Sequence, residues 1–353
     1  MELSKKKYVF ITGATGFIGS YVVKEFIQNG WIVAALIHKT SSTELDILAQ
    51  KGISVLFYGD VSHENSLINV MNQMLKEFGT PPEVIVHCAG RASDVGRDTE
   101  FKRNNFDSVR FIGQWVLKNN IKRFIFVSTT DVYGLRNFNH EREEELSFEK
   151  KSWNPYPKYK IAAEKWLIEN LPSEKYVIIR PAAVWGVGDK TLIPRILNFI
   201  RMSPFIIHFG YLKGKNRWPL AHVKNVATVI YLAAMLPEMT GISLHVLDEE
   251  YTTSDEFYRM LIRVFYPEKK NIPSITFPFW FGRIIGYINT LISDLFNLSH
   301  PWMDPTLYAL YSVSSNLDFD NNKFLEIIKQ SGKPIYTREQ GIEELKDIIR
   351  KKN

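Results

Sequence analysis

Short apolar runs alternate with longer segments of helical periodicity along the first half of the chain. The apolar runs are rich in β-branched residues and nearly free of polar positions, as in parallel strands that are buried on both faces. This alternation is typical of βαβ units, and it predicts an α/β fold built on a doubly wound parallel sheet. The predicted strands cover residues 8–12, 32–37, 53–58, 84–88, 123–128 and 176–180.

A first helix is predicted over residues 17–29, directly after the first strand. Apolar residues recur at positions 18, 22, 23, 26 and 27, which share one helical face, and Gly30 provides a stop. After Pro181 the alternation loosens into a region rich in glycine, proline and aromatic residues, and a helical pattern resumes over 222–235. We therefore expect a sheet domain over 1–180 and a smaller C-terminal lobe over 181–353.

Residues 281–296 form an amphipathic pattern within this lobe. Positions 281, 284, 285, 288, 291, 292, 295 and 296 are apolar and share a face, while 283, 289, 290, 293 and 294 are polar. Arg283 and Asp294 within the stretch, with Pro273 and Pro278 before it, argue against a membrane-spanning segment. Such a helix can pack on the core, cover a hydrophobic pocket or make a peripheral contact with a membrane, and the sequence leaves all three open.

Composition narrows the class of protein. With 353 residues and 45% hydrophobic positions, the chain can bury a large core. Its single cysteine, Cys88, excludes an internal disulfide and fits a reducing compartment, so we expect a cytoplasmic protein, with attachment to a membrane as the alternative. The segment from Met1 to Lys7 leads into an apolar run too short for an export signal.

The charge balance adds little about partners. The net charge is +6, but basic residues alternate with acidic ones, so nucleic-acid binding is not predicted. The charged stretch 141–151 holds both signs and two apolar residues, and is expected to be a solvated loop or short helix. A homodimer remains open.

A glycine-rich turn stands where the first strand meets the first helix. Glycines at this junction allow a tight turn and a close approach of the backbone to a pyrophosphate, while the helix N-terminus offers free N–H groups. The flanking strand and helix favour dinucleotide binding over the alternative of a purely structural turn. The expected contacts are Gly13, Thr15, Gly16, Phe17, Ile18 and Gly19.

Further motifs follow in an order that resembles the extended short-chain dehydrogenases, within the NAD(P)-dependent epimerase/dehydratase superfamily. Residues 189–194, 217–220 and 222–227 resemble the 3β-hydroxysteroid dehydrogenase branch. The resemblance implies a Rossmann fold, a nicotinamide cofactor and a C-terminal lobe that binds a small-molecule substrate. It places Asp60 and Val61 at the adenine, Ala89 and Gly90 beside the cofactor, Asn105 as a structural asparagine, Thr129 as an active hydroxyl, and Tyr156 with Lys160 as the catalytic pair.

The chemistry of such a pair follows from its residue types. Hydride transfer from a carbinol carbon requires a group that removes the hydroxyl proton, and a lysine ammonium can lower a tyrosine pKa enough for that role. Tyr156 and Lys160 are four residues apart, so a helix places them on one face, although such pairs also occur by chance. Thr129 can hydrogen-bond the substrate oxygen, with Ser128 and Thr130 as neighbouring alternatives.

Four further residues bear on these roles. Asn105 can either cap a helix or hold water near Lys160. Dehydratases of the family have an Asp-Glu pair after their threonine, whereas this chain has Thr130 and Asp131, which makes dehydration less favoured. Tyr159 stands where the family often has Ser or Thr.

The end of the second strand bears on the cofactor. A carboxylate there bonds the ribose 2′-hydroxyl of NAD, whereas a basic residue accommodates the 2′-phosphate of NADP. No acid follows until Glu44, while His38, Lys39 and Ser41 or Ser42 could line a phosphate site. NADP is therefore favoured over NAD, with Lys39 as a mere surface residue the alternative.

Three functions follow from these features. The first is an NADP-linked oxidoreductase acting on a secondary alcohol or ketone, which the resemblance tilts toward an apolar, sterol-like or lipid-like substrate. The second is a nucleotide-sugar epimerase using the same Thr129, Tyr156 and Lys160, and the third is a dinucleotide-sensing protein without turnover. No metal site is expected, because His222 lacks partners at ligand spacing and is interpreted as structural or capping.

Overall fold

The six predicted strands lie side by side in one parallel sheet of seven strands in the computed structural model, which describes residues 7–352. Predicted and observed bounds agree to within one residue at each end. The strand order is β3-β2-β1-β4-β5-β6-β10. The strands are β1 (Tyr8–Thr12), β2 (Ile32–Ile37), β3 (Ser54–Tyr58), β4 (Val84–His87), β5 (Arg123–Val127), β6 (Tyr176–Pro181) and β10 (Ser243–Val246).

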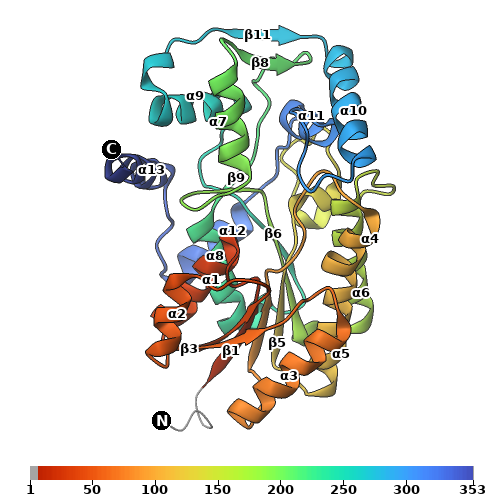
Figure 1. Cartoon of the computed structure of the whole chain (residues 1–353), viewed down its shortest axis with the longest axis vertical. Coiled ribbons are helices and arrows are strands. Elements are labelled where there is room, and N and C mark those ends of the chain that lie inside the picture. The colour runs from red at the N-terminus through yellow and green to blue at the C-terminus, as the bar shows by residue number, and fades with distance from the viewer. Residues whose placement is uncertain (1–6, 353) are drawn as a thin grey trace.

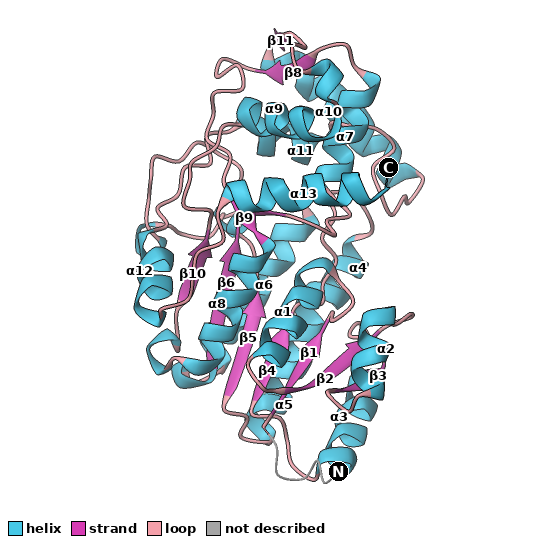
Figure 2. Ribbon diagram, turned by 90° about the vertical axis from the view of Figure 1, so that its left-hand side faces the viewer, coloured by secondary structure: helices cyan, strands magenta, loops and turns pink. Residues whose placement is uncertain are grey.

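This order fixes where a ligand can bind. The chain adds β2 and β3 on one side of β1 and then crosses to add β4, β5 and β6 on the other side. The loops that leave β1 and β4 therefore run in opposite directions and open a crevice at the carboxyl ends of these strands. Figure 2 shows the strand arrows pointing toward the smaller lobe, so the crevice faces that lobe.

Helices cover both faces of the sheet, as a doubly wound fold requires (Figures 1 and 2). Val9 and Ile11 of β1 pack into one apolar layer, while Tyr8 and Phe10 pack into the other. The first layer is completed by α1 (Phe17–Gln28), α2 (Thr43–Gln50), α8 (Val223–Met235) and α12 (Asn322–Ser331), and the second by α3 (Glu64–Phe78), α5 (Ser108–Lys118) and α6 (Pro155–Asn170).

The C-terminal half is divided between the sheet and the lobe. β10 pairs with β6, and α8 packs against α1, so parts of 181–353 complete the sheet domain rather than the lobe. The lobe stands at the top of Figure 1, and the helix expected over 281–296 is its α10. Its elements are α7 (Leu192–Met202), β8 (Ile206–Phe209), α9 (Ser254–Phe265), β11 (Ser274–Phe277), α10 (Phe279–Leu295) and α11 (Leu307–Ser314).

Smaller elements complete the chain. The charged stretch 141–151 is a loop with one short turn at Glu143–Glu145, as expected. Of the segment from Met1 to Lys7, residues 1–6 lie outside the described residues. The remaining elements are α4 (Asp98–Phe101), the paired short strands β7 (Ala183–Trp185) and β9 (Leu220–His222), and α13 (Arg338–Lys352).

A buried ion pair ties α6 to the sheet. Arg180 at the end of β6 donates its Nε to both oxygens of Glu164 on α6, each at 3.1 Å. Ser128, at the end of β5, donates its hydroxyl to the same carboxylate at 2.5 Å. Both charged side chains are almost fully buried, so each depends on the other for solvation. This arrangement holds the helix that carries Tyr156 and Lys160 against two neighbouring strand ends.

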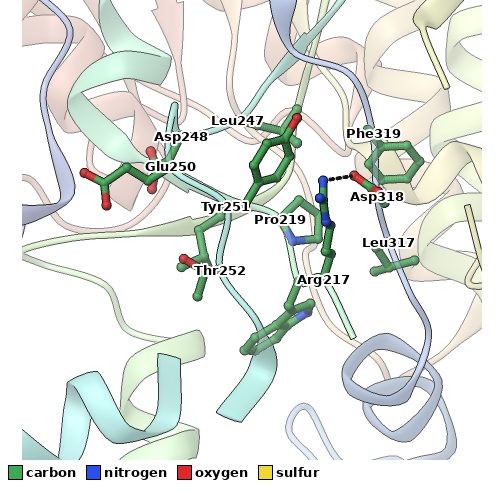
Figure 3. A pocket seen from close by; sticks show the side chains of 12 residues that line it. Arg217, Pro219, Leu247, Asp248, Glu250, Tyr251, Thr252, Leu317, Asp318 and Phe319 are labelled. Carbon is green, nitrogen blue, oxygen red and sulfur yellow. Dashed lines mark hydrogen bonds and ion pairs between the residues drawn. The ribbon is translucent and has the colours of Figure 1, made fainter. Parts of the chain in front are cut away.

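One recess lies between β9 and the segment that precedes α12. Figure 3 shows Arg217 directed at Asp318, and their charged atoms are 2.9 Å apart. The Arg217 guanidinium also lies 4.0 Å from the ring centre of Tyr251. Residues 217–220, from the half of the chain expected to bind substrate, line part of this recess, but none of the residues expected to bind cofactor or to act in catalysis does. We therefore assign Arg217 and Asp318 to joining the C-terminal segment to the sheet domain.

Candidate active site

The glycine turn between β1 and α1 depends on the absence of side chains at two positions. Gly13 has φ +69°, and a Cβ there would lie 2.7 Å from the backbone nitrogen of Ala89 after β4. A Cβ at Gly19 would lie 2.0 Å from the carbonyl oxygen of Gly13. The turn is closed by a hydrogen bond of 2.9 Å from the Gly16 N–H to the same oxygen. The crevice therefore has a bare backbone floor.

The N-terminus of α1 opens onto this floor. Its cap residue, Gly16, supplies no side-chain hydrogen bond, and the first turn contains no acidic residue. The N–H groups of Phe17, Ile18 and Gly19 are thus free of helical partners, and the helix dipole favours an anion beside them. Thr15 lies in the same turn and is partly exposed. This cradle fits the pyrophosphate of a dinucleotide.

The residues expected at the adenosine end lie together beyond β2 and β3. His38 and Lys39 are exposed after β2, while Val61 is buried after β3. The imidazole of His38 lies 3.3 Å from the carboxylate of Asp60, which also accepts the N–H of Ser62 at 2.9 Å. Asp60 is thus held at the edge of the crevice beside the end of β2.

Gly90, Asn105 and Lys160 meet beyond the end of β4. A Cβ at Gly90 would lie 2.8 Å from Asn105 Oδ1 and 3.6 Å from Lys160 Nζ. Asn105 holds the backbone of Arg91 from both sides, accepting its N–H at 2.7 Å and donating to its carbonyl at 3.0 Å. Asn105 therefore shapes the loop after β4, immediately beside the Lys160 ammonium.

Asn105 lies within a helical segment rather than at its start, so the alternative that it caps a helix is wrong. Helical structure already starts at Asp98, and Asn105 falls within a π-helical stretch, Lys102–Asp107, that continues into α5. Its side-chain oxygen accepts the Arg91 N–H rather than a free N–H group at the start of a helix, which is a second argument against capping. A widened π turn of this kind often occurs at functional sites.

Tyr156 and Lys160 lie in the first two turns of α6. The helix begins where it does because Asn154 caps it, accepting the Tyr156 N–H at 2.9 Å, and because Pro155 suits the first helical position. The spacing of four residues then places both side chains on one face, as expected. Tyr159 faces elsewhere, because its hydroxyl donates to Asp98 at 2.5 Å.

The electrostatics of this pair differ from the expectation. The Lys160 ammonium donates to the carbonyl of Val127 at 2.7 Å, and burial lowers the pKa of Lys160 to about 8. Burial raises the pKa of Tyr156, the nearby Asp131 carboxylate raises it further, and a hydrogen bond with Thr129 lowers it only in part. The predicted lowering of the tyrosine pKa is thus replaced by a net rise, and Lys160 is not among the groups that shift it.

Thr129 is the hydroxyl that influences Tyr156, because its side chain lowers the Tyr156 pKa. The same hydroxyl accepts the Asp131 N–H at 3.2 Å. The neighbouring Ser128 is instead committed to Glu164, so the structure favours Thr129 over Ser128. Thr130 is buried in the turn that follows β5.

Two further groups belong to this cluster, and one of them escaped sequence analysis. Asp131 accepts a hydrogen bond from the hydroxyl of Tyr308, which reaches the site from α11 of the lobe. Burial raises the pKa of Asp131, and the hydrogen bond from Tyr308 opposes this rise. Burial and the neighbouring Asp131 also raise the pKa of Tyr308. Tyr308 lies in no recognisable motif, so only the folded chain reveals it.

His222 has a structural role, in line with its interpretation from the sequence. It caps α8 by accepting the Lys224 N–H at 3.3 Å, and it packs edge-on against Trp185. Within residues 7–352, no group of three or more His, Cys, Asp and Glu side chains is arranged to hold a metal ion.

Gly19→Ala should abolish dinucleotide binding, because the added methyl group would collide with the Gly13 carbonyl and open the turn. We expect calorimetry with NAD and NADP to show at least a tenfold loss of affinity, roughly 1.4 kcal/mol. Gly30→Ala is the control. Its φ of +80° means that an alanine there should lower the stability of the protein, but nothing lies within 4 Å of its Cβ position, so the affinity should stay intact. Unchanged affinity in Gly19→Ala would contradict the assignment.

Comparison with known proteins agrees with this geometry. A family profile described as the NAD dependent epimerase/dehydratase family matches residues 9–242. A sterol-4-alpha-carboxylate 3-dehydrogenase (decarboxylating) of Dictyostelium discoideum is 26% identical over 353 residues, covering 96% of this chain and 100% of that protein. A UDP-glucose 4-epimerase of Vibrio cholerae is 23% identical over 304 residues, covering 79% of this chain and 83% of that protein.

A solved structure shares the fold over nearly the whole chain. The dTDP-glucose 4,6-dehydratase of Bacillus anthracis in complex with NAD superimposes with a TM-score of 0.71 at 18% identity, covering 98% of this chain and 97% of that one. The family profile spans well over half of the sequence and contains every residue of the cradle and the tyrosine cluster except Tyr308. The chain belongs to the NAD-dependent epimerase/dehydratase family, as an NAD(P)-dependent enzyme of the extended short-chain dehydrogenase type.

Proposed function

We propose that this protein is an NADP-linked oxidoreductase that interconverts a secondary alcohol and a ketone on an apolar small molecule. The observation that carries the proposal is that the first two turns of α6 hold Tyr156 and Lys160, and that Lys160 meets Gly90 and Asn105 at the crevice. A proton-transferring group and an ammonium are thus held beside the floor that fits a dinucleotide.

Each side chain has a separate task in this chemistry. The nicotinamide, when bound, supplies the two-electron oxidant or reductant. Thr129 hydrogen-bonds the substrate oxygen and orients it toward Tyr156, which takes the hydroxyl proton in oxidation and returns it in reduction. Because burial raises the pKa of Tyr156, the phenol is protonated at neutral pH and serves directly as the acid for ketone reduction. Lys160 and Asn105 hold the strand ends around it.

Aromatic side chains at the mouth of the site support an apolar substrate. Trp153 lies 6.0 Å from Tyr308 and 6.1 Å from Tyr311, measured between ring centres. Tyr311 in turn lies 5.2 Å from Phe279 at the start of α10. A row of rings thus leads from Tyr308, which binds Asp131, to the start of α10. The similarity to a protein named as a sterol-4-alpha-carboxylate 3-dehydrogenase favours the same class of substrate.

Epimerisation of a nucleotide sugar is the second candidate, since the chain is also similar to a UDP-glucose 4-epimerase. The same Thr129, Tyr156 and Lys160 would serve it, but the cofactor would remain bound and no net change in reduced nicotinamide would occur. Absorbance of the reduced nicotinamide, followed with pooled alcohols and with nucleotide sugars, separates the two reactions.

The preference for NADP rests on the surroundings of Lys39. It is exposed immediately after β2, and the first acid beyond it, Glu44, pairs instead with Lys24 of α1 at 3.1 Å. Ser42 caps α2 by accepting the Leu45 N–H at 3.2 Å, so the positive end of that helix dipole also lies close by. These features favour the additional phosphate of NADP over the bare ribose hydroxyl of NAD.

Tyr156→Phe should abolish turnover while leaving cofactor affinity unchanged, because only the phenolic oxygen is lost. We expect kcat to fall at least a hundredfold, within the usual contribution of a proton-transfer group, as measured by reduced-nicotinamide absorbance. Tyr159→Phe, whose hydroxyl binds Asp98 outside the crevice, is the matched control and should retain activity. Equal turnover by the Tyr156 variant and the control would refute the catalytic role.

Asp131→Asn should move the pH profile of alcohol oxidation to lower pH. Oxidation requires the phenolate and therefore rises with pH through the Tyr156 pKa, which the Asp131 charge raises. Removing that charge lowers the pKa. Tyr308→Phe keeps the charge and should not move the rising limb downward. A limb that stays in place, or moves upward, in Asp131→Asn would contradict this coupling.

Lys39→Glu should reverse the cofactor preference. We expect affinity for NADP to fall about tenfold or more, since a charge-assisted contact with the phosphate is replaced by repulsion, while affinity for NAD changes little. Binding is measured by calorimetry or thermal shift. Lys51→Glu, an exposed change just beyond the other end of α2, is the control. Tighter binding of NAD than of NADP by the unaltered protein would overturn the NADP assignment.

A further inference from the structure

Helix α10 is packed the opposite way from an ordinary amphipathic helix. The residues that it buries are small or polar, and most of its large apolar side chains are exposed. Ile284 and Leu291 are each 51% exposed, and Leu295 is 70% exposed. Figure 1 shows this helix on the outer side of the lobe. The buried positions are Gly282, Gly286, Asn289 and Ser293.

The buried face fixes this orientation. A Cβ at Gly286 would lie 3.0 Å from the backbone of Leu307, so α11 can approach only because position 286 is bare. Asn289 donates to the carbonyl of Pro305 at 2.9 Å, and Ser293 accepts the N–H of Trp302 at the same distance. Turning the helix to bury its apolar face would break these hydrogen bonds and force large side chains into the contact.

The exposed apolar residues form one continuous stripe along the helix and past its end, which we call the α10 surface. Its members recur at helical spacing, and aromatic residues stand at both ends and near the middle. Core packing, one of the three roles left open by the sequence, therefore does not account for this stripe. The α10 surface consists of Trp280, Ile284, Tyr287, Ile288, Leu291 and Leu295, followed by Phe296, Trp302 and Met303.

We propose that the α10 surface inserts into the interface of an anionic lipid membrane, with the helix lying parallel to the bilayer plane. Trp and Tyr side chains are suited to that depth, because their rings are apolar and their N–H and O–H groups reach the headgroups. Among residues 7–352, no helix is long and apolar enough to cross a membrane. The contact is therefore peripheral and depends on the buried apolar area and on charge.

The charge of the lobe selects this partner over a second copy of the chain. In the lobe, residues 192–215 contain four basic and no acidic residues, and residues 254–310 contain five of each. The two segments together have a net charge of +4 out of +6 for the whole chain, all of it contributed by 192–215. A symmetric dimer through the α10 surface would bring two such lobes together, whereas an anionic bilayer attracts them. At the far end of the helix, exposed Arg97 donates to Asn297 at 3.0 Å and adds a further positive charge.

The site's mouth lies beside this surface. Phe279, which starts α10, is the outer member of the row of rings that runs through Tyr311 and Trp153 to Tyr308. A protein seated on the α10 surface would thus hold this row near the acyl region, where an apolar substrate is dissolved. The proposed membrane contact is argued from the exposed stripe and the charge alone. A failure of the proposed reaction would therefore not contradict it, and the reverse is also true.

Flotation of the full chain with vesicles tests the proposal. The probes are phosphatidylcholine vesicles with and without phosphatidylserine. We expect the unaltered protein to float with the anionic vesicles, and Ile284→Glu with Leu291→Glu to lower the bound-to-free ratio at least about tenfold, given two apolar side chains withdrawn from contact. High salt should weaken binding because it screens the lipid charge.

The control places the same change on equally exposed apolar residues of the sheet domain, Ile47→Glu with Ile68→Glu, and should float like the unaltered protein. Equal melting temperatures and dinucleotide affinities establish that each variant is folded. The proposal would be overturned if the unaltered protein stayed in the bottom fraction while the anionic vesicles floated, or if the α10 variant floated as well as the unaltered protein. Equal binding to neutral vesicles would also overturn it, as would a solution dimer that the α10 variant converts to a monomer without any vesicle binding.

Discussion

The position of the catalytic residues depends on the buried ion pair between Arg180 and Glu164. It adds to the apolar contacts of α6 and to the hydrogen bond from Lys160 to the Val127 carbonyl of β5. The Glu164 carboxylate accepts from β6 through Arg180 and from β5 through Ser128, so the helix is fixed in both register and rotation. Breaking such a pair leaves one charge buried and unpaired, which costs about 3–5 kcal/mol. A helix set in this way presents Tyr156 to Thr129 in a defined orientation.

Much of the sheet and cradle could be predicted because their signals are local. A buried parallel strand is a short apolar run, and the glycines of the first turn follow one such run directly. β10 escaped prediction because its sequence, SLHV, is not a continuous apolar run, and it joins the sheet by pairing with β6, far away in the sequence. Tyr308 escaped because its contact with Asp131 spans 177 positions. The π turn at Asn105 likewise follows from packing around Arg91, which no local pattern encodes.

The chemistry of the tyrosine was harder to infer than its location. Spacing alone puts Lys160 near Tyr156, and the simplest electrostatic argument then lowers the tyrosine pKa. In the folded chain, burial and the Asp131 carboxylate both raise the Tyr156 pKa, and the Lys160 ammonium donates to the Val127 carbonyl instead. Proximity in a helix therefore identifies partners, while the sign of a pKa shift depends on everything that surrounds them.

The lobe is assembled from two excursions of the chain, at 192–215 and 254–310, and between them the chain returns to the sheet through α8 and β10. No single cut can therefore release the lobe as a fragment, and neither excursion contains a complete core by itself. Each is anchored at both ends to strands or helices of the sheet domain, which limits how far the lobe can swing. A lobe tied at four points cannot open like a hinged lid, so Tyr308 stays close to Asp131 and shape selection is built into the resting fold.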